Sequence, residues 1–206
     1  SRGLGDVYKR QGLSRCYNIM SQIYTVKRLD SMAFEWQLKE IELTEKYDLE
    51  NYNISQTYSQ ISSYYINTNQ PEKALEALKK ADATAYSPTQ KISVQLEYVN
   101  YYSKFGDMQA AEKILNECKT AFDQDKRLWS IKKRLYNIEY VYYLQSKQYP
   151  KALEAAKKQE AEELNLSESI QNSVHYLTKG KIYSNMGNMS EAIKYLQMYI
   201  EAEDSL

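Results

Sequence analysis

The 206-residue sequence is poor in the residues that interrupt helices and build tight turns. It contains 6 Gly and 3 Pro, too few for the many turns of a β-sandwich or β-barrel. It also lacks a long hydrophobic run, because the longest apolar stretch is Tyr140–Leu144, far short of a bilayer-spanning helix. These absences favour a helical fold and predict no membrane span. We therefore expect a soluble domain, of either the cytoplasm or the periplasm.

An excess of charge of one sign is absent as well. The chain has 27 basic and 27 acidic side chains, which gives a formal net charge of zero. Lysine pairs such as Lys79-Lys80 and Lys157-Lys158 are scattered and interleaved with Glu, a pattern typical of solvated helix faces. A nucleic-acid-binding protein concentrates positive charge, so we predict no nucleic acid partner.

Residues for catalysis or metal binding are scarce. His175 is the one histidine, and a metal site needs several converging ligands. Cys16 and Cys118 are far apart and have no CxxC context, so we interpret both as small buried hydrophobic residues. The carboxylate run at residues 160–163 is better explained as a solvated helix end than as a catalytic pair. We predict no enzyme activity, no metal and no cofactor.

The first eleven residues, SRGLGDVYKRQ, differ from the rest in composition and periodicity. We interpret 1–11 as a non-native or disordered tract, and 12–206 as the folded domain. The sequence carries no initiator Met and no signal-peptide pattern. We interpret the chain as a fragment of a longer protein.

What the chain does have is an internal repeat. Alanines at 33, 74, 111, 152 and 192 recur at steps of 41, 37, 41 and 40 residues. Nine residues before each alanine stands a tyrosine, and three residues before that tyrosine a Gly or Ser occurs in three of the five copies. The small residue lets a neighbouring helix approach, and the alanine opens a second helix on the side facing the first. A regular repeat of this length indicates stacked helix pairs.

The turns between the paired helices have suitable chemistry. Gly106-Asp107 and Gly187-Asn188 each combine a residue that tolerates left-handed backbone with a helix-capping side chain. Asn69 takes the same place in its copy. Pro71 and Pro150 fall at the first positions of second helices, where a missing N–H costs nothing. Each copy therefore predicts a helix-turn-helix unit.

The order of aromatic residue, small residue, Tyr, Ala and large apolar residue resembles the tetratricopeptide repeat over residues 14–206. The copies depart from that family in a longer period, in Tyr or Gln where Trp is usual, and in the loss of most of its Leu-Gly pair. The resemblance implies an all-α fold, a right-handed α-solenoid of about five tetratricopeptide-like units. We place those units at about 14–51, 52–87, 88–126, 127–166 and 167–206.

The resemblance also implies a binding surface, because the first helix of each unit lines the concave side of such a superhelix. Asn side chains there can bond a peptide backbone, and Lys or Arg can hold a carboxylate. The alternative is that these polar residues only solvate an open face. The inward-facing candidates are Asn67, Asn100, Lys104, Arg134, Asn137, Lys181 and Asn185.

We therefore expect a scaffold that binds a protein or peptide partner. The alternative is a sensory or regulatory segment of a larger bacterial membrane-associated signalling protein, whose histidine kinase or DNA-binding output domain would lie outside this chain. The final unit has no complete capping helix, and its second helix is expected to run to about Asp204. We therefore predict an exposed apolar strip at this end, and self-association through it.

Overall fold

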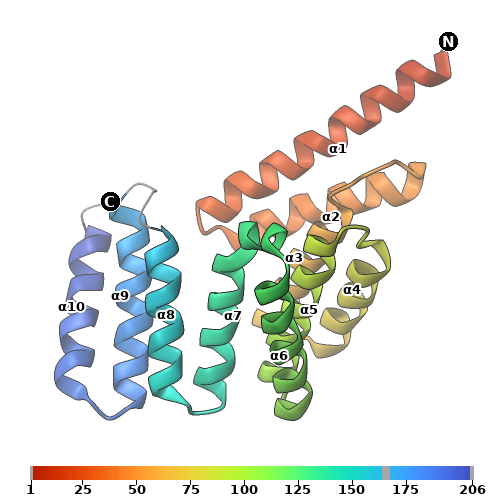
Figure 1. The fold of residues 1–206 in the computed structure, drawn as a ribbon. Coiled ribbons are helices and arrows are strands. Elements are labelled where there is room, and N and C mark those ends of the chain that lie inside the picture. Colours follow the sequence, from red (N-terminus) through yellow and green to blue (C-terminus); the bar gives the residue numbers. More distant parts are fainter. Residues whose placement is uncertain (1, 164–167, 205–206) are drawn as a thin grey trace. The chain divides into compact units, whose positions relative to one another are not determined.

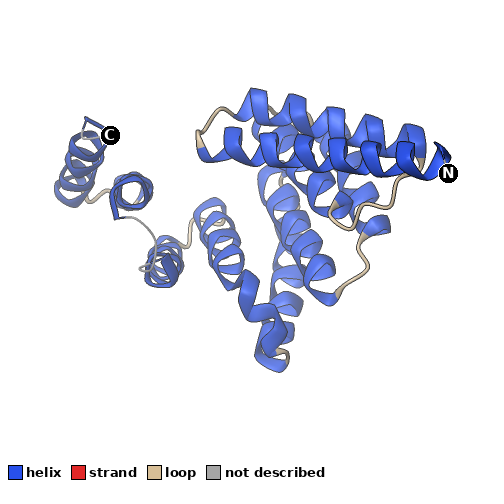
Figure 2. Cartoon of the chain, turned by 90° about the horizontal axis from the view of Figure 1, so that it is seen from above, coloured by secondary structure: helices blue, strands red, loops and turns tan. Residues whose placement is uncertain are grey.

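The computed structural model describes residues 2–163 and 168–204, and within these ranges it contains ten α-helices, one short 3₁₀-helix and no strand (Figure 1). Figure 2 shows the helices joined by short loops. The helices are α1 (Arg2–Val26), α2 (Asp30–Tyr47), α3 (Ile54–Asn67), α4 (Pro71–Thr84), α5 (Pro88–Phe105), α6 (Met108–Gln124), η1 (Lys126–Ile131), α7 (Lys132–Gln145), α8 (Tyr149–Glu163), α9 (Glu168–Asn185) and α10 (Met189–Asp204).

The helices follow one another as consecutive pairs in two compact units, residues 1–97 and 98–206. In the first unit α1 packs on α2, α3 packs on α4, and α2 also contacts α3. In the second unit α7, α8, α9 and α10 stand side by side, each packed on the next (Figure 1). Short connections force neighbouring helices to run antiparallel. The all-α helix-pair fold predicted from the repeat is confirmed.

The N-terminal tract differs from the expectation of disorder. Helix α1 begins at Arg2, so residues 2–11 are helical and continuous with the first helix of the first pair. The sequence prediction leaves these residues outside the folded domain because they lack the repeat's periodicity. A helix needs no such periodicity when it extends beyond its packing partners. Whether the tract is native to the protein stays a prediction.

Left-handed backbone recurs at the turn of every helix pair. Gly106 and Gly187 have φ of 100° and 75°, and Asn69 has φ of 59°, as their residue types predicted. Arg28 and Lys147 take the same place in their copies with φ of 56° and 59°. Left-handed φ is unfavourable for residues with a Cβ, so the packing of the paired helices imposes this turn whichever residue occupies it.

The small residues of the repeat are buried where paired helices meet. All five repeat alanines are buried. A Cβ built on Gly180 in α9 would lie 2.9 Å from both Cγ and Cδ2 of Leu196 in α10, closer than side chains tolerate. Ser62 is fully buried, and its hydroxyl donates to the Ala74 carbonyl at 3.0 Å. The predicted close approach of the second helix at these positions is confirmed.

Tyrosine rings pack against one another and lie under lysine ammonium groups, as with Lys80 over Tyr58 and Lys179 over Tyr195. The Tyr183 and Tyr195 rings stack with centroids 5.5 Å apart in the second unit. In the first unit the Tyr58 hydroxyl donates to Glu45, which also receives a hydrogen bond from Lys80. The Tyr58 hydrogen bond and the Lys80 ammonium lower the pKa of Glu45, whereas burial and the Glu45 carboxylate raise the pKa of Tyr58. Such rings offer a large apolar face with a polar tip.

The two cysteines lie in opposite surroundings. Cys118 is buried in α6, as predicted, and burial with the nearby Glu117 charge raises its pKa to about 12. Cys16 is exposed on α1, so its interpretation as a buried residue was wrong. The reason is that Cys16 lies on the face of α1 opposite to Ser14 and Ser21, which are buried.

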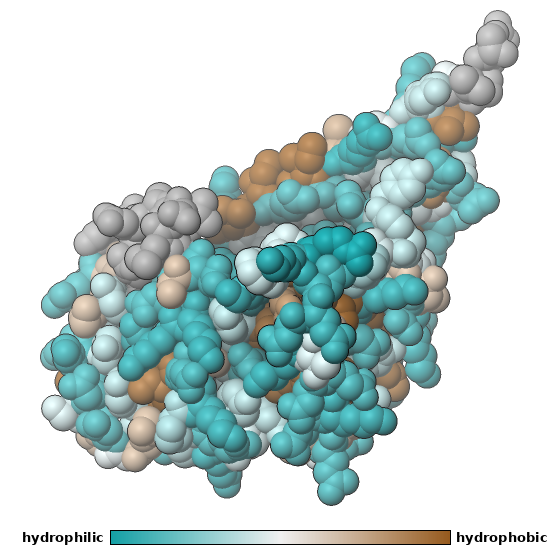
Figure 3. All heavy atoms as spheres, in the orientation of Figure 1, coloured by the Kyte–Doolittle hydropathy of each residue, from teal (hydrophilic) through white to brown (hydrophobic). Residues whose placement is uncertain are grey.

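Apolar side chains are exposed on the first and last helices of the chain. On α1 they include Ile19, Ile23 and Val26, and Figure 3 shows a run of apolar surface over this helix. On α10, Met189, Ile193 and Ile200 are 57, 55 and 56% exposed. Their spacing of four and seven residues places them on one face of the helix. The exposed strip predicted for the last repeat is therefore present.

Candidate functional site

A polar groove lies in the first unit, where the end of α1 and the start of α2 face α3. It encloses about 460 Å³. Helix α3 presents Gln60, Ser63 and Asn67 to it, because residues three, four and seven positions apart share one face of a helix. The full lining is Thr25, Asp30, Ser31, Ala33, Gln37, Gln60, Ser63, Tyr64, Asn67 and Thr68.

Side-chain contacts hold the walls of this groove. The Gln37 amide donates to Gln60 Oε1 at 3.1 Å, and the Ser63 hydroxyl donates to the buried Glu97 at 2.7 Å. The Tyr64 ring stacks on Phe34 with centroids 4.0 Å apart. These contacts fix α2 and α5 against α3, whereas Asn67 itself is exposed. The groove therefore offers an amide at its open end and a rigid aromatic wall beside it.

The structure brings Asn67 into this groove and places the other six predicted site residues on three later helices. Asn100 and Lys104 lie on α5, Arg134 and Asn137 on α7, and Lys181 and Asn185 on α9. Each pair is three or four residues apart and so shares one face of its helix. Asn100 and Arg134 are half-buried, whereas the remaining four are exposed. The Asn185 amide donates to the Lys181 carbonyl at 2.8 Å. The binding role of all seven residues stays a prediction.

A second cavity, of about 450 Å³, lies between α1, α2 and the loop that leads into α3. It is lined by Gln11, Ser14, Arg15, Asn18, Ile19, Glu40, Glu50, Asn51, Tyr52 and Asn53. Glu40 is 1% exposed, and sequence reasoning missed it. The available signal was its register. Glu40 stands seven residues after Ala33, where the next two copies have Ala81 and Cys118.

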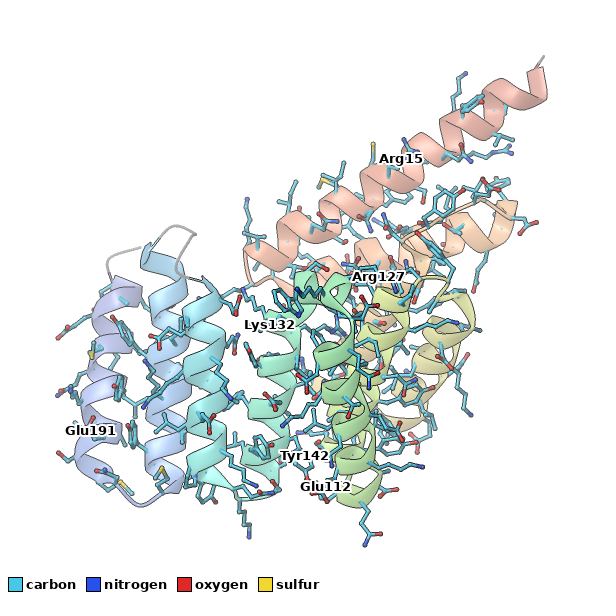
Figure 4. The ribbon with its side chains drawn as sticks, viewed as in Figure 1. Arg15, Glu112, Arg127, Lys132, Tyr142 and Glu191 are labelled. Carbon is cyan, nitrogen blue, oxygen red and sulfur yellow. The ribbon has the colours of Figure 1, made fainter. Side chains whose placement is uncertain are left out.

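In the second unit, two adjoining cavities of about 370 and 330 Å³ share Lys119, Glu139 and Lys158. Lys119 binds the buried Glu139 carboxylate at 2.8 Å. Burial works to lower the pKa of Lys119, but the hydrogen bond and charge of Glu139 raise it above its ordinary value. Lys132, labelled at the start of α7 in Figure 4, pairs with Glu162 at 3.0 Å. These charges stabilise one another.

No group of three or more His, Cys, Asp and Glu side chains in residues 2–163 and 168–204 is arranged to hold a metal ion. Within the same ranges, no helix is long and apolar enough to cross a bilayer. His175 is buried in α9.

Comparison with known families decides the membership of the chain. The model described as "26S proteasome subunit RPN7" matches residues 25–158, which is well over half of the sequence. The chain belongs to the RPN7 family. A second model, of the tetratricopeptide repeat, matches residues 176–205. The RPN7 match contains Asn67, Asn100, Lys104, Arg134 and Asn137, and the tetratricopeptide match contains Lys181 and Asn185. A search of curated proteins found no match.

Solved structures resemble this RPN7-family chain in fold. BtubC (BKLC) from P. vanneervenii is 13% identical, with a TM-score of 0.57, and the match covers 97% of this chain and 87% of BtubC. Two structures of MamA are each 19% identical with TM-scores of 0.46. Those matches cover 93% and 90% of this chain, and 92% and 95% of the MamA chains. The tetratricopeptide match at residues 176–205 and the consecutive helix pairs make this RPN7-family chain an all-α repeat protein of the tetratricopeptide type.

Proposed function

We propose that the chain is a scaffold that binds an extended segment of a protein partner in the polar groove of α1, α2 and α3. Tetratricopeptide-type repeats serve generally as protein-interaction scaffolds, and their stacked helices offer extended binding surfaces. The observation that carries the proposal is the position of Asn67. Its amide is exposed at the groove that Gln60 and Ser63 line.

The groove matches the chemistry and the size of a short peptide segment. An Asn side chain can both donate to and accept from a peptide backbone. From Gln60 to Asn67, α3 rises about 10 Å, which is the length of about three residues of extended chain. The Phe34–Tyr64 stack supplies an aromatic surface for one side chain of that segment.

One further feature supports a scaffold. The RPN7 family takes its description from a 26S proteasome subunit, which is a component of a multi-subunit assembly.

We also propose a separate contact surface on α5, α7 and α9, on which Lys and Arg hold partner carboxylates. Its residues are Asn100, Lys104, Arg134, Asn137, Lys181 and Asn185.

The experiment uses peptides selected from a random display library against the full chain, with affinity measured by calorimetry. Asn67→Ala is expected to weaken binding about 2- to 12-fold, because a hydrogen bond made by this exposed amide contributes about 0.5–1.5 kcal/mol. Gln60→Ala should act in the same direction. Asn116→Ala, on the exposed face of α6, is the matched control and should leave binding unchanged. Equal affinities for Asn67→Ala and Asn116→Ala would remove the groove from the proposal.

The second surface is tested in the same assay. Arg134→Glu combined with Asn100→Ala and Asn137→Ala should weaken peptides that carry a free C-terminal carboxylate. The same peptides with an amidated C-terminus should lose less affinity in the triple variant, because they lack the carboxylate that Arg134 would hold. A triple variant that binds both peptide forms like wild type would contradict a role for this surface.

We also propose that the exposed strip of α10, formed by Met189, Ile193 and Ile200, associates with a second copy of the chain. Apolar strips on the last repeat of an array are ordinarily covered. Sedimentation should show concentration-dependent association that Ile193→Glu abolishes. Lys194→Glu introduces a carboxylate at an exposed position of α10 off the strip and should leave association intact. A wild-type chain that stays monomeric at high concentration would contradict the proposal.

A further inference from the structure

Glu40 is a carboxylate at a core position of the first unit. It is 1% exposed, at the register position where Ala81 and Cys118 stand in the next two copies. An ionised carboxylate loses most of its hydration on burial, and that loss is costly unless a cation compensates it. The replacement of a small residue by a buried acid therefore calls for an explanation in function or in packing.

The described contacts of Glu40 are all with neutral donors. Asn51 Nδ2 donates to Glu40 Oε1 at 2.9 Å, and Asn18 Nδ2 donates to Oε2 at 3.1 Å. The Thr57 hydroxyl donates to Oε2 at 3.1 Å. Among the residues that the structure describes, no Lys, Arg or His forms an ion pair with Glu40. The hydrogen bonds hold the carboxylate in place and leave its charge uncompensated.

The two asparagines that hold Glu40 also line the cavity. Both amides turn their N–H groups to the carboxylate, and both side chains line the cavity. Their carbonyl oxygens are then directed away from Glu40, and each keeps spare acceptor capacity beside its present partner, the Gln22 amide for Asn18 and the Asn53 N–H for Asn51.

The rest of the lining also suits a cation. Glu50 adds a second carboxylate, and Tyr52 adds a side chain that is 66% exposed. The face of an aromatic ring attracts cations. The one basic lining residue is Arg15, an exposed side chain of α1 that is labelled in Figure 4. With Glu40, Glu50 and Arg15 charged, the cavity has a net negative charge. Ile19 and Tyr52 offer apolar surface for an aliphatic stem.

We propose that this cavity binds a primary ammonium or guanidinium group on an aliphatic stem, with Glu40 and Glu50 supplying the countercharge. The cavity shares no lining residue with the groove of α1, α2 and α3, so the site is independent of the proposed peptide groove. A lysine or arginine side chain of a partner and a free polyamine present the same chemistry, and the test separates them.

The test is calorimetry on the full chain with matched ligands. The cationic probes are n-butylguanidinium, spermidine and the peptides acetyl-Gly-Arg-Gly-amide and acetyl-Gly-Lys-Gly-amide. The neutral controls are n-pentanol and acetyl-Gly-norleucine-Gly-amide. Cationic probes should bind at least tenfold more tightly than neutral ones, and added salt should weaken them. An Arg or Lys peptide that binds tenfold more tightly than the free cations assigns the site to a partner's side chain, and the reverse order assigns it to a free amine.

Variants then locate the site. Glu40→Gln should weaken cation binding at least tenfold. Glu42→Gln removes the same charge from an exposed position of α2 and should change nothing. If Glu40→Gln does not fold, Glu50→Gln serves instead, because Glu50 is an exposed loop residue, and it should weaken binding several-fold. Cationic and neutral probes that bind alike, or cation affinities that Glu40→Gln and Glu50→Gln leave unchanged, would overturn the proposal.

Discussion

Replacing Gly180 by alanine tests the close approach of α9 and α10. Two effects of the added methyl group oppose one another. Alanine favours a helix over glycine by about 1 kcal/mol. The new Cβ would lie 2.9 Å from Leu196 Cγ and Cδ2, and because Cγ is a branch point, Leu196 cannot escape by moving its tip alone. Overpacking of this kind costs about 1–3 kcal/mol. We expect Gly180→Ala to lower the free energy of unfolding by about 1 kcal/mol.

The sign of the effect should reverse when Leu196 is shortened. In a Leu196→Ala background the clash is gone, and Gly180→Ala should then stabilise the chain by about 1 kcal/mol through helix propensity. The coupling energy between the two sites is therefore about 2 kcal/mol, within the range found for residues in contact. Urea unfolding followed by circular dichroism at 222 nm measures all four chains.

Gly12→Ala is the matched control. Gly12 lies inside α1, and a Cβ there would meet nothing within 4 Å, so the substitution should stabilise by about 1 kcal/mol. If Gly180→Ala stabilised the chain as much as Gly12→Ala, or if its effect were the same with and without Leu196, the reasoning from close helix packing would be refuted.

Three further predictions concern the turns and the titrating groups. Lys147→Gly relieves left-handed backbone strain of about 1–2 kcal/mol and adds an entropic cost of about 0.5–1 kcal/mol. The melting temperature should therefore rise by about 2–4 °C. A fall in the melting temperature would show that Lys147 is unstrained. A thiol reagent should label Cys16 at once and Cys118 only after unfolding, because Cys118 is buried and its pKa is raised to about 12. Rapid labelling of both cysteines would contradict the burial of Cys118. The pKa of Glu45 is lowered by the Tyr58 hydrogen bond and a lysine, so its stabilising effect is present above the unfolded pKa and lost as pH falls through the folded one. Since this carboxylate is half-exposed, Glu45→Gln should reduce the loss of stability between pH 7 and pH 3 by only about 0.5 kcal/mol, and an unchanged or larger loss would contradict the pairing.

The helix pairs could be predicted from the sequence because their signals are local. The alanine spacing marks the second helix of each pair, and Gly106 and Gly187 mark the turn by their conformational freedom alone. Arg28 and Lys147 carry no such signal, yet they adopt the same left-handed backbone. At these two positions the packing of the paired helices imposes the left-handed turn. The sequence locates such a turn only when the copy is aligned to the other copies of the repeat.

The candidate sites were less predictable because they depend on contacts between helices. Asn67 could be named from its place on a first helix, but its groove is formed with α1 and α2. The environment of Glu40 comes from Asn18, Asn51 and Thr57, which lie up to 22 residues from it in sequence. A glutamate in a mixed-charge helix resembles a solvated residue until its partners are known.

The buried interior of residues 1–97 is rich in polar side chains, including Ser14, Ser21, Thr44, Ser55, Thr57, Ser59 and Ser62. Exposing apolar surface raises the heat capacity on unfolding, whereas exposing polar surface lowers it. This unit should therefore unfold with a heat-capacity change below the usual 12–15 cal/mol/K per residue. A smaller heat-capacity change flattens the dependence of stability on temperature. These serines and threonines thus make the stability of the N-terminal unit less sensitive to cooling and warming than an aliphatic core of the same size would.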